Sequence, residues 1–236
     1  MGNSSNKYGK SKFTIKLIVN KLIKKRYTWS LTAMGWLVTV FLLGLIVLTP
    51  LFYLHNFLAL QRPLPNADVL VVEGWLSDQA LLMAIEEFEA GEYQFLVTTG
   101  LPLEKGYYLA EYKTFAQLTE ATLLKLGFPA NQLVAVPTKY VMKNRTMATA
   151  LSVKKWLLSQ SNLSVKSMNI VSWGPHSRRS WLIFQQVMQP EFSVGIIAIP
   201  PTSYDPARWW QSSEGFRATI SELIAYIYAK FINWQS

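Results

Sequence analysis

The 35 residues between Arg26 and Arg62 include no charged side chain. The centre of this stretch, from about Gly35 to Leu54, is almost wholly apolar, and a helix of about 20 apolar residues is long enough to cross the hydrocarbon layer of a bilayer. Segment 29–60 is therefore predicted to be a transmembrane anchor. Aromatic side chains of the kind found at membrane–water interfaces stand near both of its ends: Trp29, Trp36, Phe52, Tyr53 and Phe57.

A cleaved signal peptide is the alternative interpretation of this segment. The apolar region of a signal peptide is shorter and is followed by small residues at the cleavage site. Residues 50–60 instead carry bulky side chains and contain no A-x-A pattern. We therefore expect an uncleaved anchor, with the lipid bilayer as a partner of the chain.

The distribution of charge predicts the orientation of this anchor. Residues 1–61 contain eight basic and no acidic residues, and Arg62 is the only basic residue among the forty that follow. Because basic residues are retained on the cytoplasmic side of a membrane, residues 1–28 are expected to form a cytoplasmic tail. The rest of the chain is expected in the periplasm, or an equivalent extracytoplasmic space, at a bacterial inner membrane.

The same distribution argues against nucleic-acid binding. The formal net charge is +9, of which the first 61 residues carry +8 and residues 62–236, with 15 basic and 14 acidic side chains, carry only +1. A surface that binds a nucleic-acid duplex requires a basic patch on the folded domain itself. Nucleic acid is therefore not expected among the partners of this nearly neutral domain.

The two prolines in segment 61–66 predict an extended linker, followed by a domain over residues 67–236. In that domain, short β-branched runs alternate with longer helical patterns. This alternation predicts an α/β fold with a Rossmann-like, doubly wound, mostly parallel sheet of about five strands. The expected strands are 68–73, 94–99, 132–136, 168–173 and 194–199. The expected helices are 77–90, 107–126, 144–160, 176–188 and 213–232.

In doubly wound sheets the ligand site lies beyond the carboxyl ends of the strands. Glu73, at the tip of the first strand, is a candidate base, or else a structural partner of a nearby arginine. The other residues that directly follow a strand pattern are candidates for ligand binding: Gly74, Trp75, Thr99, Gly100 and Gly174.

The segment after the fourth strand contains the strongest local signal for a site. Pro175 suits the first position of a helix, and the helix start brings free N–H groups next to His176, Arg178 and Arg179. This combination favours an anion such as phosphate or carboxylate. His176 titrates near neutral pH and is a candidate acid or base. Alternatively, the imidazole packs locally and the arginines pair with surface carboxylates.

A second cluster follows the third strand. Arg145 and Thr146 open a helix there and can face the same crevice, although a solvated helix start with Asn144 as N-cap is the alternative. The sequence contains no G-x-S-x-G, G-x-x-x-x-G-K-[ST], G-x-G-x-x-G or H-E-x-x-H motif. With two His, no Cys and no carboxylate cluster, no metal site is predicted, and no cofactor is identified.

Several of these residues form an ordered set of motifs. The first strand, D-V-L-V-V, leads to a glycine, the second ends in T-T-G, and Glu111 lies in the helix expected after it. L-G-F-P-A-N-Q-L precedes the third strand, and Arg145-Thr146 comes close before Ala150. The fourth strand runs into H-x-x-R, formed by His176 and Arg179. In this order and spacing, residues 67–230 resemble the YdcF/SanA/ElyC family of bacterial envelope-associated domains.

The resemblance implies a Rossmann-like fold, a periplasmic domain and a role in envelope integrity or in cell-wall or surface-polysaccharide metabolism. It also implies that Glu111 belongs to the site. Glu73-Gly74-Trp75 stands where the family commonly has a glycine-rich turn, and Ala148-Thr149 stands where Glu-Asn is common, so the chain resembles a divergent branch.

Two hypotheses follow from the sequence. In the first, the chain is an enzyme that acts on a phosphate-bearing or lipid-linked glycan precursor, with the anion held by Arg145, Arg178 and Arg179. In the second, it is a non-catalytic binding or assembly factor that uses the same surface for an anionic small molecule or a protein. Both remain open at this stage, because folds of this kind support either role.

Overall fold

The computed structural model describes residues 31–160 and 164–231, so the predicted cytoplasmic tail at 1–28 lies outside the described residues. Chain contacts divide the protein into two compact units, which meet between Val47 and Leu48. Helix α2 (Ala33–Leu58) contains the boundary between them. The second unit consists of the end of α2 and the α/β domain.

Helix α2 has 26 residues and contains no Asp, Glu, Lys or Arg, and a histidine lies in its last turn. Its length and its mean hydropathy of 2.5 over an 18-residue window make it a candidate membrane span. Pro50 lies inside the helix, near its end. The described helix falls within the anchor segment predicted from the sequence.

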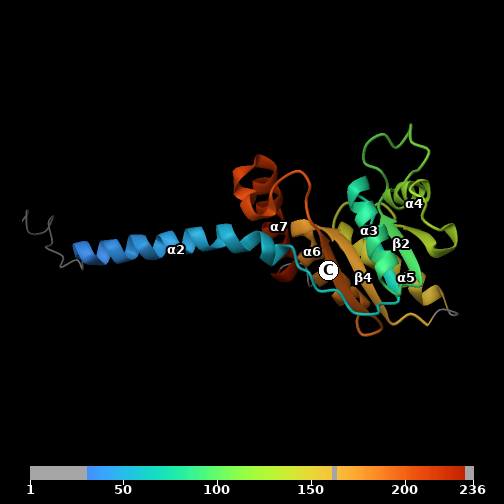
Figure 1. The fold of residues 1–236 in the computed structure, drawn as a ribbon, viewed down its shortest axis with the longest axis horizontal. Helices are drawn as coiled ribbons and strands as arrows, with labels where there is room; N and C mark the ends of the chain where they lie inside the picture. Colours follow the sequence, from blue (N-terminus) through green and yellow to red (C-terminus); the bar gives the residue numbers. More distant parts are fainter. Residues whose placement is uncertain (1–30, 161–163, 232–236) are drawn as a thin grey trace, which may run out of the picture. The chain divides into compact units, whose positions relative to one another are not determined.

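Five parallel strands form one sheet in the order β3-β2-β1-β4-β5 (Figure 1). After β3 the chain returns to the other side of β1 to form β4, so the strand order reverses between β1 and β4. In doubly wound sheets, ligands bind at this point of reversal. The strands are β1 (Val69–Glu73), β2 (Phe95–Gly100), β3 (Leu133–Pro137), β4 (Ser167–Trp173) and β5 (Ser193–Ile199).

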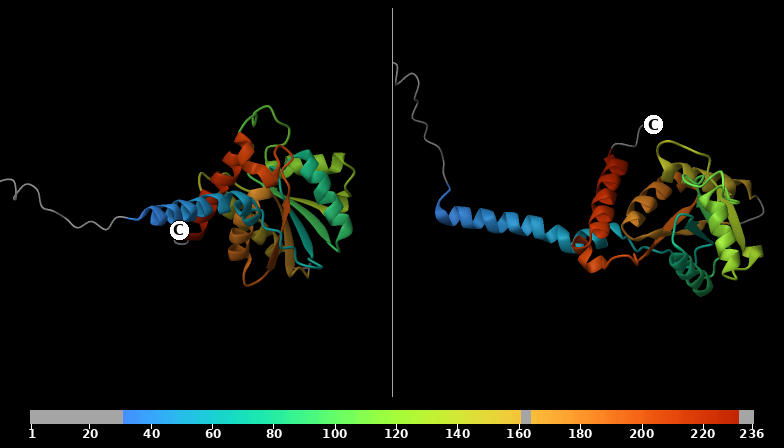
Figure 2. Two further views of the ribbon diagram at one scale, coloured as in Figure 1. Left: turned by 60° about the vertical axis from the view of Figure 1, so that its left-hand side comes forward. Right: turned by 90° about the horizontal axis from the view of Figure 1, so that it is seen from above.

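Helices cover both faces of this sheet (Figures 1 and 2). Alternate residues of β1 point to opposite faces, so Leu70 and Val72 join a core beneath α3 and α4, and Val69 and Val71 join a core beneath α5 and α6. All four side chains are fully buried. The helices are α3 (Asp78–Ala90), α4 (Phe115–Lys125), α5 (Arg145–Ser159), α6 (Ser177–Met188) and α7 (Ser213–Phe231), with short 3-10 turns η1 (Ala130–Gln132), η2 (Gly174–His176) and η3 (Pro206–Gln211).

The predicted α/β fold is therefore confirmed, and each predicted strand is present within one residue of its expected bounds. The helix expected at 107–126 is shorter than predicted, because it begins only at Phe115. Thr114 and Gln117 form a reciprocal capping box at that point, which fixes the start of the helix. Residues 101–114 form a loop, and the prediction that Glu111 lies in a helix was wrong.

Segment 61–66, predicted as an extended linker, is hydrogen-bonded to the α/β domain. Arg62 exchanges two backbone hydrogen bonds with Ile196, at N–O distances of 2.9 and 3.0 Å, and so covers the edge strand β5. Leu64 is held by the side-chain amide of Asn169, which both donates to its carbonyl and accepts from its N–H. The segment is extended, as its prolines require, but it belongs to the domain.

Candidate functional site

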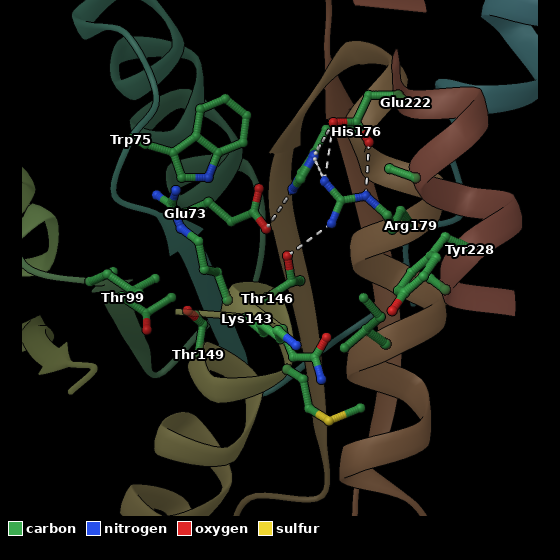
Figure 3. A pocket seen from close by; sticks show the side chains of 18 of the residues that line it. Glu73, Trp75, Thr99, Lys143, Thr146, Thr149, His176, Arg179, Glu222 and Tyr228 are labelled. Carbon is green, nitrogen blue, oxygen red and sulfur yellow. Dashed lines mark hydrogen bonds and ion pairs between the residues drawn. The ribbon is translucent and has the colours of Figure 1, made fainter. Parts of the chain in front are cut away.

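A pocket of about 700 Å³ opens at the carboxyl ends of the strands, next to the point of reversal between β1 and β4 (Figure 3). Its lining comes from the tips of β1 and β2, the start of α5, η2 and α6, and one side of α7. Eight of the site residues predicted from the sequence line it: Glu73, Trp75, Thr99, Gly100, Arg145, Thr146, His176 and Arg179.

Glu73, the last residue of β1, is only 4% exposed. Both of its carboxylate oxygens accept hydrogen bonds from buried hydroxyls, one from Ser180 at 2.6 Å and one from Ser172 at 2.7 Å. The imidazole of His176 also lies near this carboxylate, with Nε2 3.6 Å from Glu73 Oε1. Glu73 is therefore a buried carboxylate with its charge stabilised by three neighbours.

The other side of the same imidazole faces α7. His176 Nδ1 lies 3.0 Å from Oε1 of Glu222. The guanidinium of Arg179 donates two hydrogen bonds to the same carboxylate, from Nε at 2.9 Å and from Nη2 at 3.1 Å. Arg179 also donates to the hydroxyl of Thr146 at 3.3 Å. Glu73, His176, Glu222 and Arg179 thus form a continuous network, here called the charge network (Figure 3).

The charge network sets the protonation of its members. Burial alone lowers the pKa of His176, but the negative charge of Glu73 and hydrogen bonds to Glu222 and Glu73 outweigh it and raise the pKa to about 9. Burial raises the pKa of Glu222, yet its bonds to His176 and Arg179 bring it down to about 2. The pKa of Glu73 is lowered against its burial by the charge of His176 and by hydrogen bonds.

At neutral pH these values describe an imidazolium between two carboxylates, with one guanidinium beside it. The two positive and two negative charges cancel. An imidazolium on the wall of a pocket can donate a proton to a leaving group or stabilise a developing negative charge. Arg179, in contrast, has its charge neutralised by Glu222, so the charge network offers little net attraction to an anion.

Two exposed aromatic side chains lie on either side of the charge network (Figure 3). Trp75 is 43% exposed and meets the ring of His176 edge-on, with 5.0 Å between ring centroids. Tyr228 of α7 is 50% exposed and also lines the pocket. Exposed rings at a pocket wall present flat apolar faces beside polar groups.

The remaining positive charge lies at the start of α5. Lys143 is exposed and lines the pocket, and Asn144, in a left-handed conformation with φ 54°, makes no capping hydrogen bond with its side chain. The first N–H groups of a helix have no partner within it. Arg145 lies at the same rim but is paired with Glu104 at 2.5 Å. Asn144 stands at the N-cap position, as in the sequence-based alternative, but its side chain makes no capping hydrogen bond.

Two glycines of the predicted site have a structural role outside the pocket. A Cβ on Gly74 would lie 2.7 Å from the carbonyl oxygens of Phe115 and Thr99, so the turn after β1 can pack there only as glycine. Gly174 has φ 28°, which favours glycine, and is buried beside Pro201. Neither glycine belongs to the pocket lining.

Arg178 and Glu111 are also absent from the pocket lining. Arg178 points to the other side of α6, where it donates to the carbonyl of Phe57 and lies over the ring of Phe57, 3.9 Å from its centroid. Glu111 is exposed on the loop before α4. The structure therefore does not bring these two predicted site residues into the pocket.

The lining residues that were not among the predicted site residues include three with polar side chains that bear on function: Lys143, Glu222 and Tyr228. Glu222 was the hardest to find, because it is 46 residues from His176 in the chain and meets it only through the packing of α7. One signal was available. The inner face of α7 carries small or neutral residues at Gly215, Thr219 and Ala229, and a single carboxylate among them suggests a buried partner.

Within residues 31–160 and 164–231, no group of three or more His, Cys, Asp or Glu side chains has an arrangement that could hold a metal ion. Comparison with models of protein families and with curated proteins gives no match. Among solved structures, the chain is similar to the pantothenate synthetase of Thermus thermophilus, at 13% identity and a TM-score of 0.32. The match covers 72% of this chain and 80% of the synthetase. A likeness at this level carries no inference about a ligand.

Proposed function

We propose that the pocket binds a saccharide bearing a phosphate, either free or lipid-linked, and that the chain acts in envelope or surface-polysaccharide biogenesis. In this proposal α2 anchors the chain in a bacterial inner membrane and the α/β domain is extracytoplasmic. The observation that carries the proposal is one open pocket of about 700 Å³ that combines exposed Trp75 and Tyr228 with the charge network and a basic helix start.

The aromatic pair and the polar wall favour the saccharide part. The C–H face of a sugar ring is apolar and packs on an aromatic ring, while its hydroxyls need hydrogen-bond partners at the ring edge. Trp75 supplies such a face directly beside His176. The hydroxyl of Thr146 lies at the same wall as Arg179. A volume of about 700 Å³ is in the range of small-molecule sites.

The start of α5 favours the phosphate part. Positive dipole and unpaired N–H groups at a helix start attract an anion, and Lys143 adds a charge that reaches the pocket. The phosphate is therefore assigned to Lys143 and α5, rather than to the two arginines of the H-x-x-R segment, because Arg178 points away and Arg179 is paired.

The cellular role rests on three supports. α2 is long and apolar enough to span a bilayer, the excess of basic residues before it predicts an extracytoplasmic domain, and the ordered motifs resemble the YdcF/SanA/ElyC family. Membrane-anchored members of that family are associated with the envelope, where phosphate-bearing and lipid-linked glycans are handled.

A thermal-shift screen of the full chain in detergent micelles tests the proposal. The panel contains sugar phosphates, nucleotide sugars, polyprenyl-phosphate analogues and the corresponding unphosphorylated sugars. At about 100 times its dissociation constant, a ligand stabilises the folded state by roughly 2.7 kcal/mol, or about 5–11 °C in Tm for a domain of this size. We expect this shift for one phosphorylated class only.

Variants make the screen specific to the pocket. Trp75→Ala and Lys143→Ala are expected to reduce the shift. Lys139→Ala, which changes another exposed lysine of the same loop outside the pocket lining, is the matched control. The proposal fails if no phosphorylated saccharide raises the Tm of the wild type, or if Lys139→Ala and Lys143→Ala behave alike.

The alternative is a non-catalytic binding or assembly factor. The observation that favours it is the pairing of every charged side chain in the charge network with another member. His176→Gln separates the two roles, because it removes the proton donor but keeps a polar side chain. An enzyme is expected to bind its ligand and lose turnover in this variant, whereas a binding factor shows no turnover even as wild type.

A further inference from the structure

Helix α7 exposes an apolar face. Its buried side consists of Gly215, Thr219 and Ala229, which pack against the domain. The opposite side carries large apolar residues at a helical spacing of three or four: Phe216, Ile220, Ile224, Ile227 and Phe231. Phe216 is 50% exposed, Ile227 44% and Phe231 69%. The solvent face of a helix in a globular domain is ordinarily polar, so this apolar face requires an explanation.

The end of the candidate membrane span lies next to α7 and η3. A helix of about 20 residues crosses the hydrocarbon layer, so a span that begins at Ala33 ends near Phe52. At that level the carbonyl of Leu51 accepts a hydrogen bond from Trp209 Nε1 at 2.7 Å, and the ring of Phe52 meets that of Trp210 edge-on at 5.3 Å. η3, which leads directly into α7, is therefore within contact distance of the residue where the span ends.

One turn further along α2, the ring of Phe57 meets that of Tyr226 on α7 at 5.8 Å. His55 of the same turn is 3.2 Å from the hydroxyl of Tyr204. These contacts join the last turns of α2 to the loop before η3 and to the middle of α7. Because the last turns of α2 contact both the loop before η3 and the middle of α7, these parts of the domain are expected to lie close to the lipid headgroups.

The residues around the apolar face are those found at membrane interfaces. Trp210 contacts Trp209, whose ring stacks on Phe216, and Tyr228 is exposed on α7. Aromatic rings with a polar edge are enriched at the headgroup level. Arg217 and Lys230 are both exposed on α7. Basic side chains beside an apolar helix face favour anionic lipid headgroups.

We infer that α7 is an interfacial helix, which lies on the bilayer with Phe216, Ile227 and Phe231 at the boundary between headgroups and acyl chains, while Ile224, at the edge of this face, also lines the pocket. The occupant of this face is the lipid surface beside the chain's own anchor. The adjacent side of α7 forms a wall of the pocket through Ala225 and Tyr228. The pocket therefore opens along the membrane surface, where a lipid-linked saccharide presents its phosphate. This inference rests on the membrane location proposed above.

The sequence contains no cysteine, so a single cysteine can be introduced and labelled without other changes. We would attach a fluorophore at Phe216→Cys and, separately, at Ile227→Cys, because both positions are exposed and outside the pocket lining. Glu89→Cys, exposed on α3, is the control. The full chain is reconstituted in nanodiscs that contain phosphatidylglycerol, and quenching by aqueous iodide is compared with quenching by doxyl-labelled lipids.

The expected result is that doxyl lipids quench the labels at 216 and 227 and iodide does not, with the opposite pattern at 89. The inference is overturned if iodide quenches all three labels alike. It is also overturned if 216 and 227 are shielded from both quenchers, because a protein surface, such as a second copy of the chain, then covers α7. Ligand binding by the same samples is measured separately by thermal shift, so failure of the pocket proposal and failure of the α7 inference are distinguishable.

Discussion

The change Glu222→Gln tests the charge network, because it removes one charge and preserves the shape of the side chain. Glu222 is 17% exposed and has a pKa lowered to about 2, from an ordinary value of 4.5, by its bonds to His176 and Arg179. A carboxyl whose pKa is depressed on folding contributes stability above its unfolded value, and this contribution is lost as pH falls through the folded value. At roughly 1.4 kcal/mol per pH unit, the contribution is about 3 kcal/mol.

The expected result is a fall in Tm of about 6–12 °C at pH 6, because 1 kcal/mol corresponds to about 2–4 °C for a domain of this size. The difference between wild type and variant is expected to narrow as pH falls from 4.5 towards 2, where the wild-type carboxyl becomes protonated. The assay is thermal unfolding of the full chain in detergent, followed by tryptophan fluorescence across this pH range.

The pH dependence of Tm above neutral pH gives a second check on the same variant. His176 has its pKa raised to about 9, so its contribution to stability is complete below about pH 6.5 and is lost as pH rises through 9. Without Glu222 this loss is expected at a lower pH. Glu89→Gln, on the exposed side of α3, is the control, and it should leave the pH dependence of Tm unchanged at both acidic and basic pH. The role of Glu222 as an ionised member of the charge network is refuted if the variant and the wild type have the same Tm at pH 6. It is also refuted if the difference in Tm between them does not vary with pH.

Three further outcomes follow from the packing. Gly74→Ala is expected to lower the Tm by about 2–12 °C, because overpacking costs about 1–3 kcal/mol, whereas Gly44→Ala, with open space around its Cβ, should not lower it. Trp209→Phe removes the hydrogen bond from Trp209 Nε1 to the part-buried carbonyl of Leu51, so calorimetry should show that the free energy of unfolding falls by about 1 kcal/mol. Arg178→Ala is expected to leave the ligand-induced thermal shift unchanged, since this side chain points to Phe57. Loss of the shift in this variant contradicts the placement of Arg178 outside the ligand site.

The fold was predictable because it depends on patterns that local sequence carries. Buried parallel strands require apolar side chains on both faces, and β1 and β4 show this directly. The start of α4 was missed for a local reason, since the apolar residues at 107–109 continue a helical pattern that the Thr114 cap interrupts. The bonds of segment 61–66 to Ile196 and Asn169 were not predictable, because they depend on tertiary contacts.

The site was predictable where strand ends determine it. Glu73 ends one strand pattern and His176 closely follows another, and the carboxyl ends of parallel strands lie at one edge of the sheet. The two arginines after His176 could not be separated in advance, because neighbouring positions on a helix differ by about 100° in direction and the buried side was unknown. Glu222 depended on the docking of α7, whose inner face only the folded chain defines.

Photo-cross-linking with a diazirine-bearing polyprenyl-phosphate saccharide tests the central proposal most directly. The full chain in nanodiscs is irradiated with the probe and the modified peptides are mapped by mass spectrometry. We expect modification at the pocket wall, in residues 142–147 and 221–229, and competition by the unlabelled phosphorylated saccharide. Modification spread evenly over the domain, or confined to the opposite end of the sheet at residues 63–67 and 87–93, contradicts the proposal.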